Sequence, residues 1–261
     1  MHHILHWRRV LAVTLGVIVT LGASLGATAC GKSEASTLAA RPAPGRFLIA
    51  AVDISGSRTA AELQESHALL DKAIDRVGNG DKVAVIEMYQ GGREPARQWE
   101  DSVAPLHHWP DTTPADRRRA ADFRDDAHQT AATFFDPNRA RAIQSTDVLG
   151  TLFRAADYAR AAGARQVTLF VLSDMLNATR ELNMEDGRPI PGDSWIAERG
   201  RENLLPDLRN ACIVVVGADV RTPRGAAVRE FWRQYFTAAG AKFTLTNYRN
   251  MLSDPSEADC R

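Results

Sequence analysis

The sequence has 261 residues, of which 44% are hydrophobic and 25% are charged, and its formal net charge is zero. This composition is ordinary for a globular protein. The balance of charges gives no electrostatic footprint for nucleic acid and predicts no polybasic membrane patch, because removing Arg8 and Arg9 with an export signal leaves 30 basic against 32 acidic residues.

The N-terminus predicts export. Arg8 and Arg9 form a positive segment, and the uncharged apolar run Val10–Leu25 follows them. Small residues at 26–29 then precede Cys30, as cleavage by a signal peptidase requires. This arrangement resembles the lipobox of bacterial lipoproteins, in which the Cys is diacylated and becomes the new N-terminus. The resemblance implies a lipid on Cys30, with an uncleaved anchor or simple secretion as the alternatives.

The chain is therefore predicted to have three parts: a signal peptide over 1–29, the lipidated Cys with a flexible tether over 30–45, and one folded domain over 46–261. The tether is rich in Gly, Ser, Ala and Pro. The predicted location is the bacterial cell envelope. Because Gly31 rather than Asp follows the Cys, the sorting pattern of such lipoproteins favours the outer membrane in a Gram-negative cell, and otherwise the location is the cell surface.

Continuous apolar runs without alternation predict strands that are buried on both faces, as in a parallel sheet. A shorter run at Lys242–Leu245 predicts a strand nearer the edge, and Arg97–Val103 predicts an edge strand. The four buried runs are Phe47–Val52, Val83–Ile86, Val167–Leu172 and Cys212–Val216.

Amphipathic patterns between these runs predict helices over Ala60–Val77, Asp147–Ala162 and Ala226–Ala239. Strands that alternate with helices predict an α/β fold with a doubly wound, mostly parallel sheet and helices on both faces. Asn177–Glu198 predicts a long surface excursion at the carboxyl end of a strand, where binding specificity often resides.

The two remaining cysteines, Cys212 and Cys260, leave two interpretations open. In an exported protein they can form a disulfide. Alternatively, Cys212 is a small buried hydrophobe and Cys260 a free residue of the C-terminal tail.

Oxygen-bearing side chains gather at the predicted ends of strands. Asp53, Ser55 and Ser57 follow the first buried run at alternate positions. The carboxyl ends of parallel strands are where ligands bind in such sheets, and oxygen ligands with little charge suit a hard cation such as Mg²⁺. Asp147 is predicted to cap the helix that follows it.

The Asp-x-Ser-x-Ser segment resembles the metal-ion-dependent adhesion site of the von Willebrand factor A family. That family's pattern also asks for a Thr before a helix and an Asp after a later strand, and Thr146 and Asp174 stand in those places. The resemblance implies that Asp53, Ser55, Ser57, Thr146 and Asp174 hold Mg²⁺, or Mn²⁺ or Ca²⁺, with Asp174 acting mostly through water. Many family members have Gly after the last Asp, so Met175 predicts a different path for this loop.

The same resemblance implies a binding module and not an enzyme. An acidic residue of a partner protein would complete the coordination of the metal, which makes the domain a metal-dependent adhesion or scaffolding module. One alternative is a metal-dependent hydrolase, which needs further carboxylates near Asp53, with Glu87 or Asp219 as the candidates. The other alternative is a metal-free scaffold.

Overall fold

The computed structural model describes residues 45–89, 96–106, 112–140, 143, 145–185 and 187–260. The predicted signal peptide, Cys30 and the tether up to residue 44 lie outside the described residues. No helix within the described ranges is long and apolar enough to cross a membrane.

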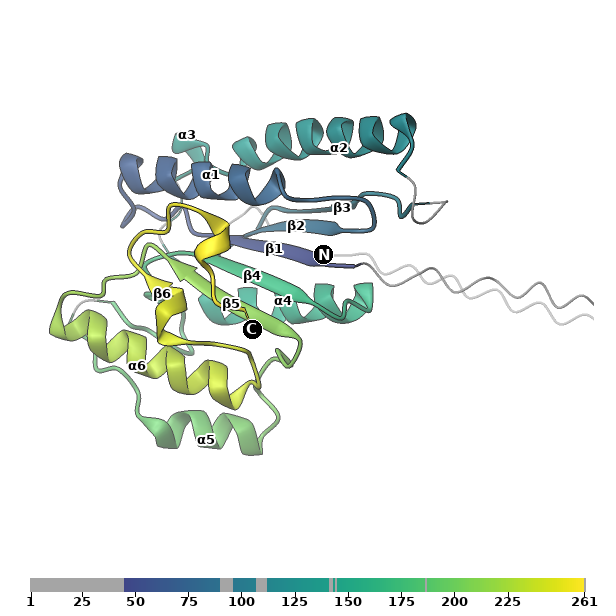
Figure 1. Ribbon diagram of the computed structural model, residues 1–261. Coiled ribbons are helices and arrows are strands. Elements are labelled where there is room, and N and C mark those ends of the chain that lie inside the picture. The colour runs from purple at the N-terminus through teal and green to yellow at the C-terminus, as the bar shows by residue number, and fades with distance from the viewer. Residues whose placement is uncertain are drawn as a thin grey trace, which may run out of the picture. The chain divides into compact units, whose positions relative to one another are not determined.

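A six-stranded sheet with the order β3-β2-β1-β4-β5-β6 forms the centre of the domain (Figure 1). All neighbouring pairs are parallel except β2 and β3, so the sheet is mostly parallel with an antiparallel edge strand. The predicted fold class is confirmed. The strands are β1 (Phe47–Val52), β2 (Lys82–Glu87), β3 (Gln98–Ser102), β4 (Val167–Leu172), β5 (Ala211–Val216) and β6 (Tyr248–Arg249).

Helices cover both faces of the sheet because its central strands are apolar on both sides. In β1, Ile49 and Ala51 belong to the core beneath α4, α5 and α6, while Ala50 and Val52 belong to the core beneath α1 and α2. The helices are α1 (Ala60–Ile74), α2 (Pro114–Thr133), α3 (Pro137–Ala140), α4 (Val148–Ala162), α5 (Asp193–Arg201) and α6 (Pro223–Ala238), with two 3₁₀ turns at Leu245–Asn247 and Pro255–Glu257.

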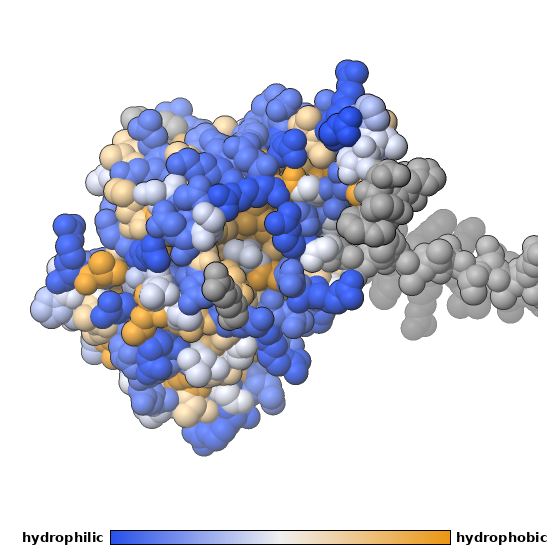
Figure 2. All heavy atoms as spheres, in the orientation of Figure 1, coloured by the Kyte–Doolittle hydropathy of each residue, from blue (hydrophilic) through white to orange (hydrophobic). Residues whose placement is uncertain are grey.

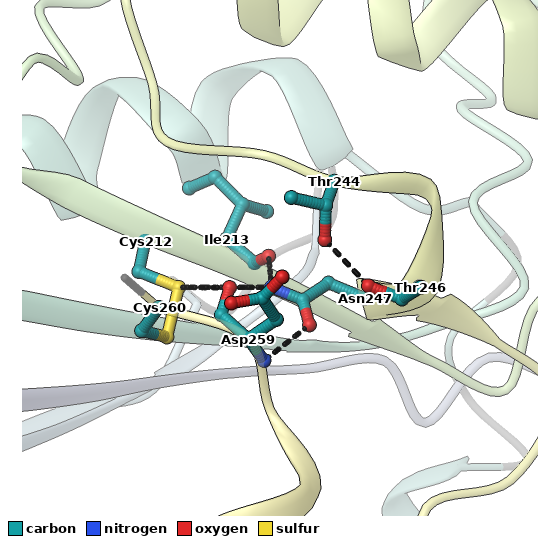
Figure 3. The surroundings of a disulfide bond; sticks show 7 residues. All are labelled: Cys212, Ile213, Thr244, Thr246, Asn247, Asp259 and Cys260. Carbon is teal, nitrogen blue, oxygen red and sulfur yellow. Dashed lines mark hydrogen bonds between the residues drawn. A yellow bond between two sulfur atoms is a disulfide. The ribbon is translucent and has the colours of Figure 1, made fainter.

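The strand predicted at Lys242–Leu245 is wrong. Of these four residues only Lys242 pairs with β5, through a single bridge to Cys212, and Leu245 is exposed in a 3₁₀ turn. The side-chain amide of Asn247 donates hydrogen bonds to the carbonyls of Ile213 (3.2 Å) and Asp259 (2.7 Å), as Figure 3 shows. The buried side chain of Asn247 thus satisfies carbonyl groups beside β5 that a longer neighbouring strand would have satisfied. The strand that does pair there, β6, is only two residues long.

The structure contains the disulfide between Cys212 and Cys260, with a Cα–Cα separation of 5.4 Å (Figure 3). It joins β5 to the C-terminal segment. Lys72 of α1 donates to the carbonyl of Ser253 in that segment (2.8 Å), and Arg76, which follows α1, forms an ion pair with Asp254 (2.6 Å). The C-terminal tail is therefore fixed to the domain at several points.

The segment Asn177–Glu198 after β4, predicted as a surface excursion, is partly buried. Leu182 and Met184 are buried in the core on the α6 side of the sheet, and α5 begins within the excursion, at Asp193. The guanidinium of Arg224, on α6, donates to the carbonyls of Met184 (2.6 Å) and Glu185 (2.7 Å). These contacts fix the loop in place near the carboxyl edge of the sheet.

Candidate metal site

Asp53 stands where β1 ends, and only 1% of it is exposed. Its backbone N–H donates to the carbonyl of Leu172 at the end of β4, at 3.0 Å, so the two strand ends are held together. Its carboxylate oxygen Oδ1 accepts the backbone N–H of Ser55 at 2.9 Å. This turn reverses the chain as it leaves the strand and directs the side chains that follow toward the edge of the sheet.

A chain of hydrogen bonds joins the hydroxyls of this turn to the other segments. The hydroxyls of Ser55 and Ser57 lie 2.9 Å apart, and that of Ser57 donates to Asp174 Oδ2 at 2.8 Å. The Thr146 hydroxyl donates to Asp53 Oδ1 at 3.3 Å. The five residues predicted as metal ligands, which come from three separate segments of the chain, therefore meet in one cluster.

Thr146 reaches the cluster from the start of α4. Asp147 is the N-cap residue of this helix, as predicted, and its Oδ1 accepts the backbone N–H of Gly150 at 2.8 Å. Buried Asn177 accepts the backbone N–H of Leu149 at 2.9 Å, so the loop after β4 is tied to the same helix end. The position of Thr146 is thus fixed from both sides.

Sequence reasoning missed Ser173, which is fully buried and donates its hydroxyl to Asp53 Oδ2 at 2.7 Å. The hydroxyl oxygen of Ser173 in turn accepts the backbone N–H of Met175 at 2.9 Å. Ser173 therefore orients both the carboxylate of Asp53 and the loop that carries Asp174. The only feature of the sequence that could have indicated this role is that Ser173 is a polar residue directly after the buried run of β4.

The prediction that Met175 changes the path of the loop is wrong. Met175 has φ 68°, in the left-handed region that Gly would adopt cheaply. Its side chain is fully buried in the core, and its carbonyl accepts the indole N–H of Trp232 at 2.9 Å. Burial and this hydrogen bond offset the strain of the conformation, so the loop keeps the left-handed turn without a glycine.

The two carboxylates of the cluster repel one another. Burial, and then the charge of Asp53, raise the pKa of Asp174 to about 6, although hydrogen bonds from the Leu176 backbone and from Ser57 oppose the increase. Raised pKa values of buried carboxylates are typical of functional sites. A cation between the two carboxylates would remove this repulsion.

Arg58 provides a positive charge behind the cluster, and sequence reasoning missed it also. Its side chain is almost fully buried and donates to the Ser66 hydroxyl of α1 at 3.1 Å, while its Nε and Nη1 atoms have no hydrogen-bond partner. Its charge lowers the pKa of Asp174, against the larger effects of burial and Asp53. The position of an arginine directly after Ser57 was the only indication of this role in the sequence.

Replacing Gly217 with Ala is expected to disturb the site through Arg58. A Cβ atom at Gly217 would lie 2.6 Å from Arg58 Nη1, and the residue has φ +102°, which an L side chain rarely adopts. We expect a loss of ~1–3 kcal/mol in the free energy of unfolding. Urea denaturation measures it, and Gly192→Ala is the control, because nothing lies within 4 Å of a Cβ there. An equal loss in both variants would contradict the prediction.

Both carboxylates named for the hydrolase alternative are held by other groups, although Asp219 lines the same cavity as Asp174. Glu87 is fully buried, accepts hydrogen bonds from Arg139 at 2.5 and 2.6 Å and from the backbone of Arg97 at 2.8 Å, and has a lowered pKa because these bonds and charges outweigh its burial. Asp219 accepts the backbone N–H groups of Arg221 (2.9 Å) and Thr222 (3.2 Å) before α6. Neither makes a hydrogen bond to the cluster around Asp53.

The donor set fits a hard divalent cation bound with several waters, because it offers two carboxylates and three hydroxyls within one hydrogen-bonded cluster. Among the described residues there is no group of three or more His, Cys, Asp and Glu side chains able to hold a metal. The cluster therefore differs from sites built from many charged ligands. The assignment of the five residues as metal ligands stays a prediction.

Together, the fold and the cluster define a doubly wound α/β domain with a hydroxyl-rich acidic site at the carboxyl edge of its sheet. No protein-family model matches the chain. No curated protein matches it either.

Solved structures give distant similarities. The chain is similar to a von Willebrand factor type A protein from Catenulispora acidiphila, with a TM-score of 0.42 and 15% identity over 82% of this chain and 40% of that one. It is similar to the ArnB paralog VWA2 from Sulfolobus acidocaldarius, with a TM-score of 0.38 and 12% identity over 84% of this chain and 44% of that one. It is also similar to the manganese-loaded Plasmodium vivax TRAP protein, with a TM-score of 0.38 and 14% identity over 82% and 70% of the two chains. The chain spans less than half the length of the first two.

Proposed function

We propose that this chain is a von Willebrand factor A-type binding module of the bacterial cell envelope, which binds a partner protein through a divalent cation. The observation that carries the proposal is the cluster itself. Five oxygen-bearing side chains from three segments are joined by hydrogen bonds at the edge where parallel sheets bind ligands.

In this proposal Asp53, Ser55 and Ser57 would bind Mg²⁺, or Mn²⁺ or Ca²⁺. Thr146 would contact the metal directly or through water, and Asp174 mostly through water. When bound, the cation acts as a Lewis acid that accepts a carboxylate oxygen from an acidic residue of the partner. Ser57 is exposed and Asp174 is only partly buried, so the cluster opens to the surface on their side. Asp53 and Ser173 lie beneath and hold the geometry.

The surface beside the cluster offers room for more of the partner. A cavity of about 370 Å³ adjoins Asp174, and Leu176 and Val228 give it apolar walls. Asp219 and Arg224 also line it, and Arg224 connects it to the fixed excursion after β4. The residues around this cavity are placed to select the partner, while the metal and the carboxylate provide orientation.

Manganese provides the test, because free Mn²⁺ is visible by electron paramagnetic resonance. We expect the wild-type chain to remove about one equivalent of the free Mn²⁺ signal and the Asp53→Asn variant to remove much less. Added acetate, as a probe for the partner's carboxylate, should then lower the water-proton relaxation enhancement of bound Mn²⁺, because it displaces a water. Equal Mn²⁺ binding by both proteins would place the metal elsewhere and overturn the proposal.

The same experiment distinguishes the alternatives. A metal-free scaffold predicts no Mn²⁺ binding by the wild type. A hydrolase needs further carboxylates directed at the metal, and the contacts of Glu87 and Asp219 do not favour it. We therefore propose that the domain is a binding module and not an enzyme, with no role in binding nucleic acid.

The proposed envelope anchor rests on the N-terminal sequence alone. We expect the mature protein, expressed in a bacterium that processes lipoproteins, to begin at a diacylated Cys30. The Cys30→Ala variant should keep its signal peptide and carry no lipid, because the thiol is the acceptor of the diacylglyceryl group. Mass spectrometry of the N-terminal peptide measures both properties, and an unmodified Cys30 in the wild type would contradict the prediction.

A further inference from the structure

The amino edge of the sheet, opposite the candidate metal site, gathers basic residues around a cavity. A space of about 180 Å³ is lined by Arg46, Arg165 and Lys242, together with polar Asn210 and the Cys212–Cys260 disulfide. The three basic residues come from positions just before β1, before β4 and after α6. They are far apart in the sequence, and only the fold brings them together.

Two of these cations have no acidic partner in the described part of the chain. Arg165 and Lys242 are exposed and form no ion pair within the described parts of the chain, whereas Arg46 pairs with Asp81 at 2.5 Å. Neighbouring charges at this edge are also neutralised, since Lys82 pairs with Glu100. Arg209 likewise pairs with Asp207, and Asp259 is the exposed acidic residue beside the disulfide. The surplus charge at the cavity is therefore positive.

An apolar groove of about 230 Å³ adjoins this cavity and shares Arg46, Thr168 and Cys260 with it. Its apolar walls include Phe170, from β4, and Val77, which follows α1. Figure 2 shows apolar surface at the centre of this view, surrounded by hydrophilic residues. Basic residues next to an apolar groove match the two parts of a phospholipid, a negative headgroup and an acyl chain.

The position of this edge agrees with a membrane contact. In the proposed mature protein, the fifteen residues from Cys30 to residue 44 precede Gly45, the first described residue. They join the domain directly before Arg46, which lines the cavity. The candidate metal site lies at the other end of β1, about 20 Å away for a strand of six residues. With this edge on the membrane, the metal site would face away from it.

We propose that this amino edge binds anionic phospholipid headgroups, with Arg165 and Lys242 contacting the phosphate. The inference rests on the envelope anchor of the proposed function and does not depend on the metal. The balanced charge of the sequence predicted no such patch, because a total charge does not record where the charges lie. Each basic residue near an anionic membrane strengthens the contact ~5-fold, which corresponds to ~1 kcal/mol.

The test uses the full chain, incorporated into phosphatidylcholine vesicles with or without ~30% phosphatidylglycerol, and isolated by flotation in the presence of EDTA. Hydrogen exchange of the backbone amides in 163–166 and 240–244 is the readout. We expect exchange to slow at least ~5-fold in the anionic vesicles, and the effect to disappear in 0.5 M salt because surface charges are then screened. Arg165→Glu and Lys242→Glu should each remove most of it.

Arg180→Glu is the matched control, since it changes the same charge at an exposed position in the excursion after β4. Equal exchange in both kinds of vesicle, or equal loss of the effect in the control, overturns the inference. If inorganic phosphate alone slows the exchange of these amides in neutral vesicles, and Arg165→Glu removes that slowing, the inference is also overturned. The cavity would then be assigned to a soluble phosphate. Because EDTA is present throughout, failure here is distinct from failure of the metal site.

Discussion

Mg²⁺ is expected to raise the midpoint of thermal unfolding of the wild-type chain by about 5–10 °C and to leave that of the Asp53→Asn variant unchanged. A ligand at ~100 times its dissociation constant stabilises the native state by ~2.7 kcal/mol. For a domain of this size each kcal/mol shifts the midpoint by ~2–4 °C. Asp53 is the residue to change because its carboxylate is buried and accepts hydrogen bonds from Ser55, Thr146 and Ser173.

Asn has nearly the shape of Asp and keeps one acceptor oxygen, so the variant loses a charge more than it loses packing. The measurement is a pair of melts, with EDTA and with Mg²⁺, for each protein, and the comparison is between the two shifts. Asp122→Asn is the matched control, because its side chain is 66% exposed on α2, away from the site. A shift in Asp53→Asn equal to that of the wild type would show that Mg²⁺ acts at another place.

The second large effect is expected from the disulfide. Replacing Cys260 with Ser should lower the free energy of unfolding by about 4 kcal/mol, because the bond closes a loop with a sequence separation of 48 and so restricts the unfolded chain. Cys260 is the better position to change, since Cys212 lies in the buried strand β5 and is only 4% exposed.

Urea denaturation of the oxidised protein and of the variant measures the difference, and the wild type treated with a reductant should match the variant. A difference below ~1 kcal/mol would contradict the prediction. The Mg²⁺ shift should survive in Cys260→Ser, because Cys212 is the second residue of β5 and the candidate metal site lies at the other end of the sheet. The two predictions therefore report on opposite edges of the same domain.

The fold class was predictable from the sequence because strands buried on both faces produce continuous apolar runs. A strand covered on both faces has to be apolar throughout, and the runs at Phe47–Val52 and Val167–Leu172 coincide with β1 and β4. The pattern failed at Lys242–Leu245, where the strand is two residues long and lies further along the chain. There the side chain of Asn247 donates the hydrogen bonds that the backbone of a neighbouring strand would otherwise donate. The periodicity of hydrophobic residues does not indicate such a substitution.

The candidate site was partly visible for a similar reason. The ends of the apolar runs mark the ends of the strands, so the sequence alone places Asp53 and Asp174 at the carboxyl edge of the sheet. Ser173 and Arg58 were missed because their roles depend on where side chains point, and the conformation of Met175 was predicted wrongly. Its left-handed backbone is tolerated only because the surrounding core holds the buried side chain in place.

By itself the sequence predicted strands β1 to β5 and helices α1, α4 and α6, the polar residues that follow the strand ends, and the signal-like N-terminus. Each of these leaves a pattern in local composition and periodicity. Only the tertiary structure decided that Cys212 and Cys260 pair, that the five oxygen-bearing side chains share hydrogen bonds, and that Arg165 and Lys242 lie around one cavity. These are relations between residues distant in the chain. They depend on how the helices pack against the sheet, and no local pattern specifies that packing.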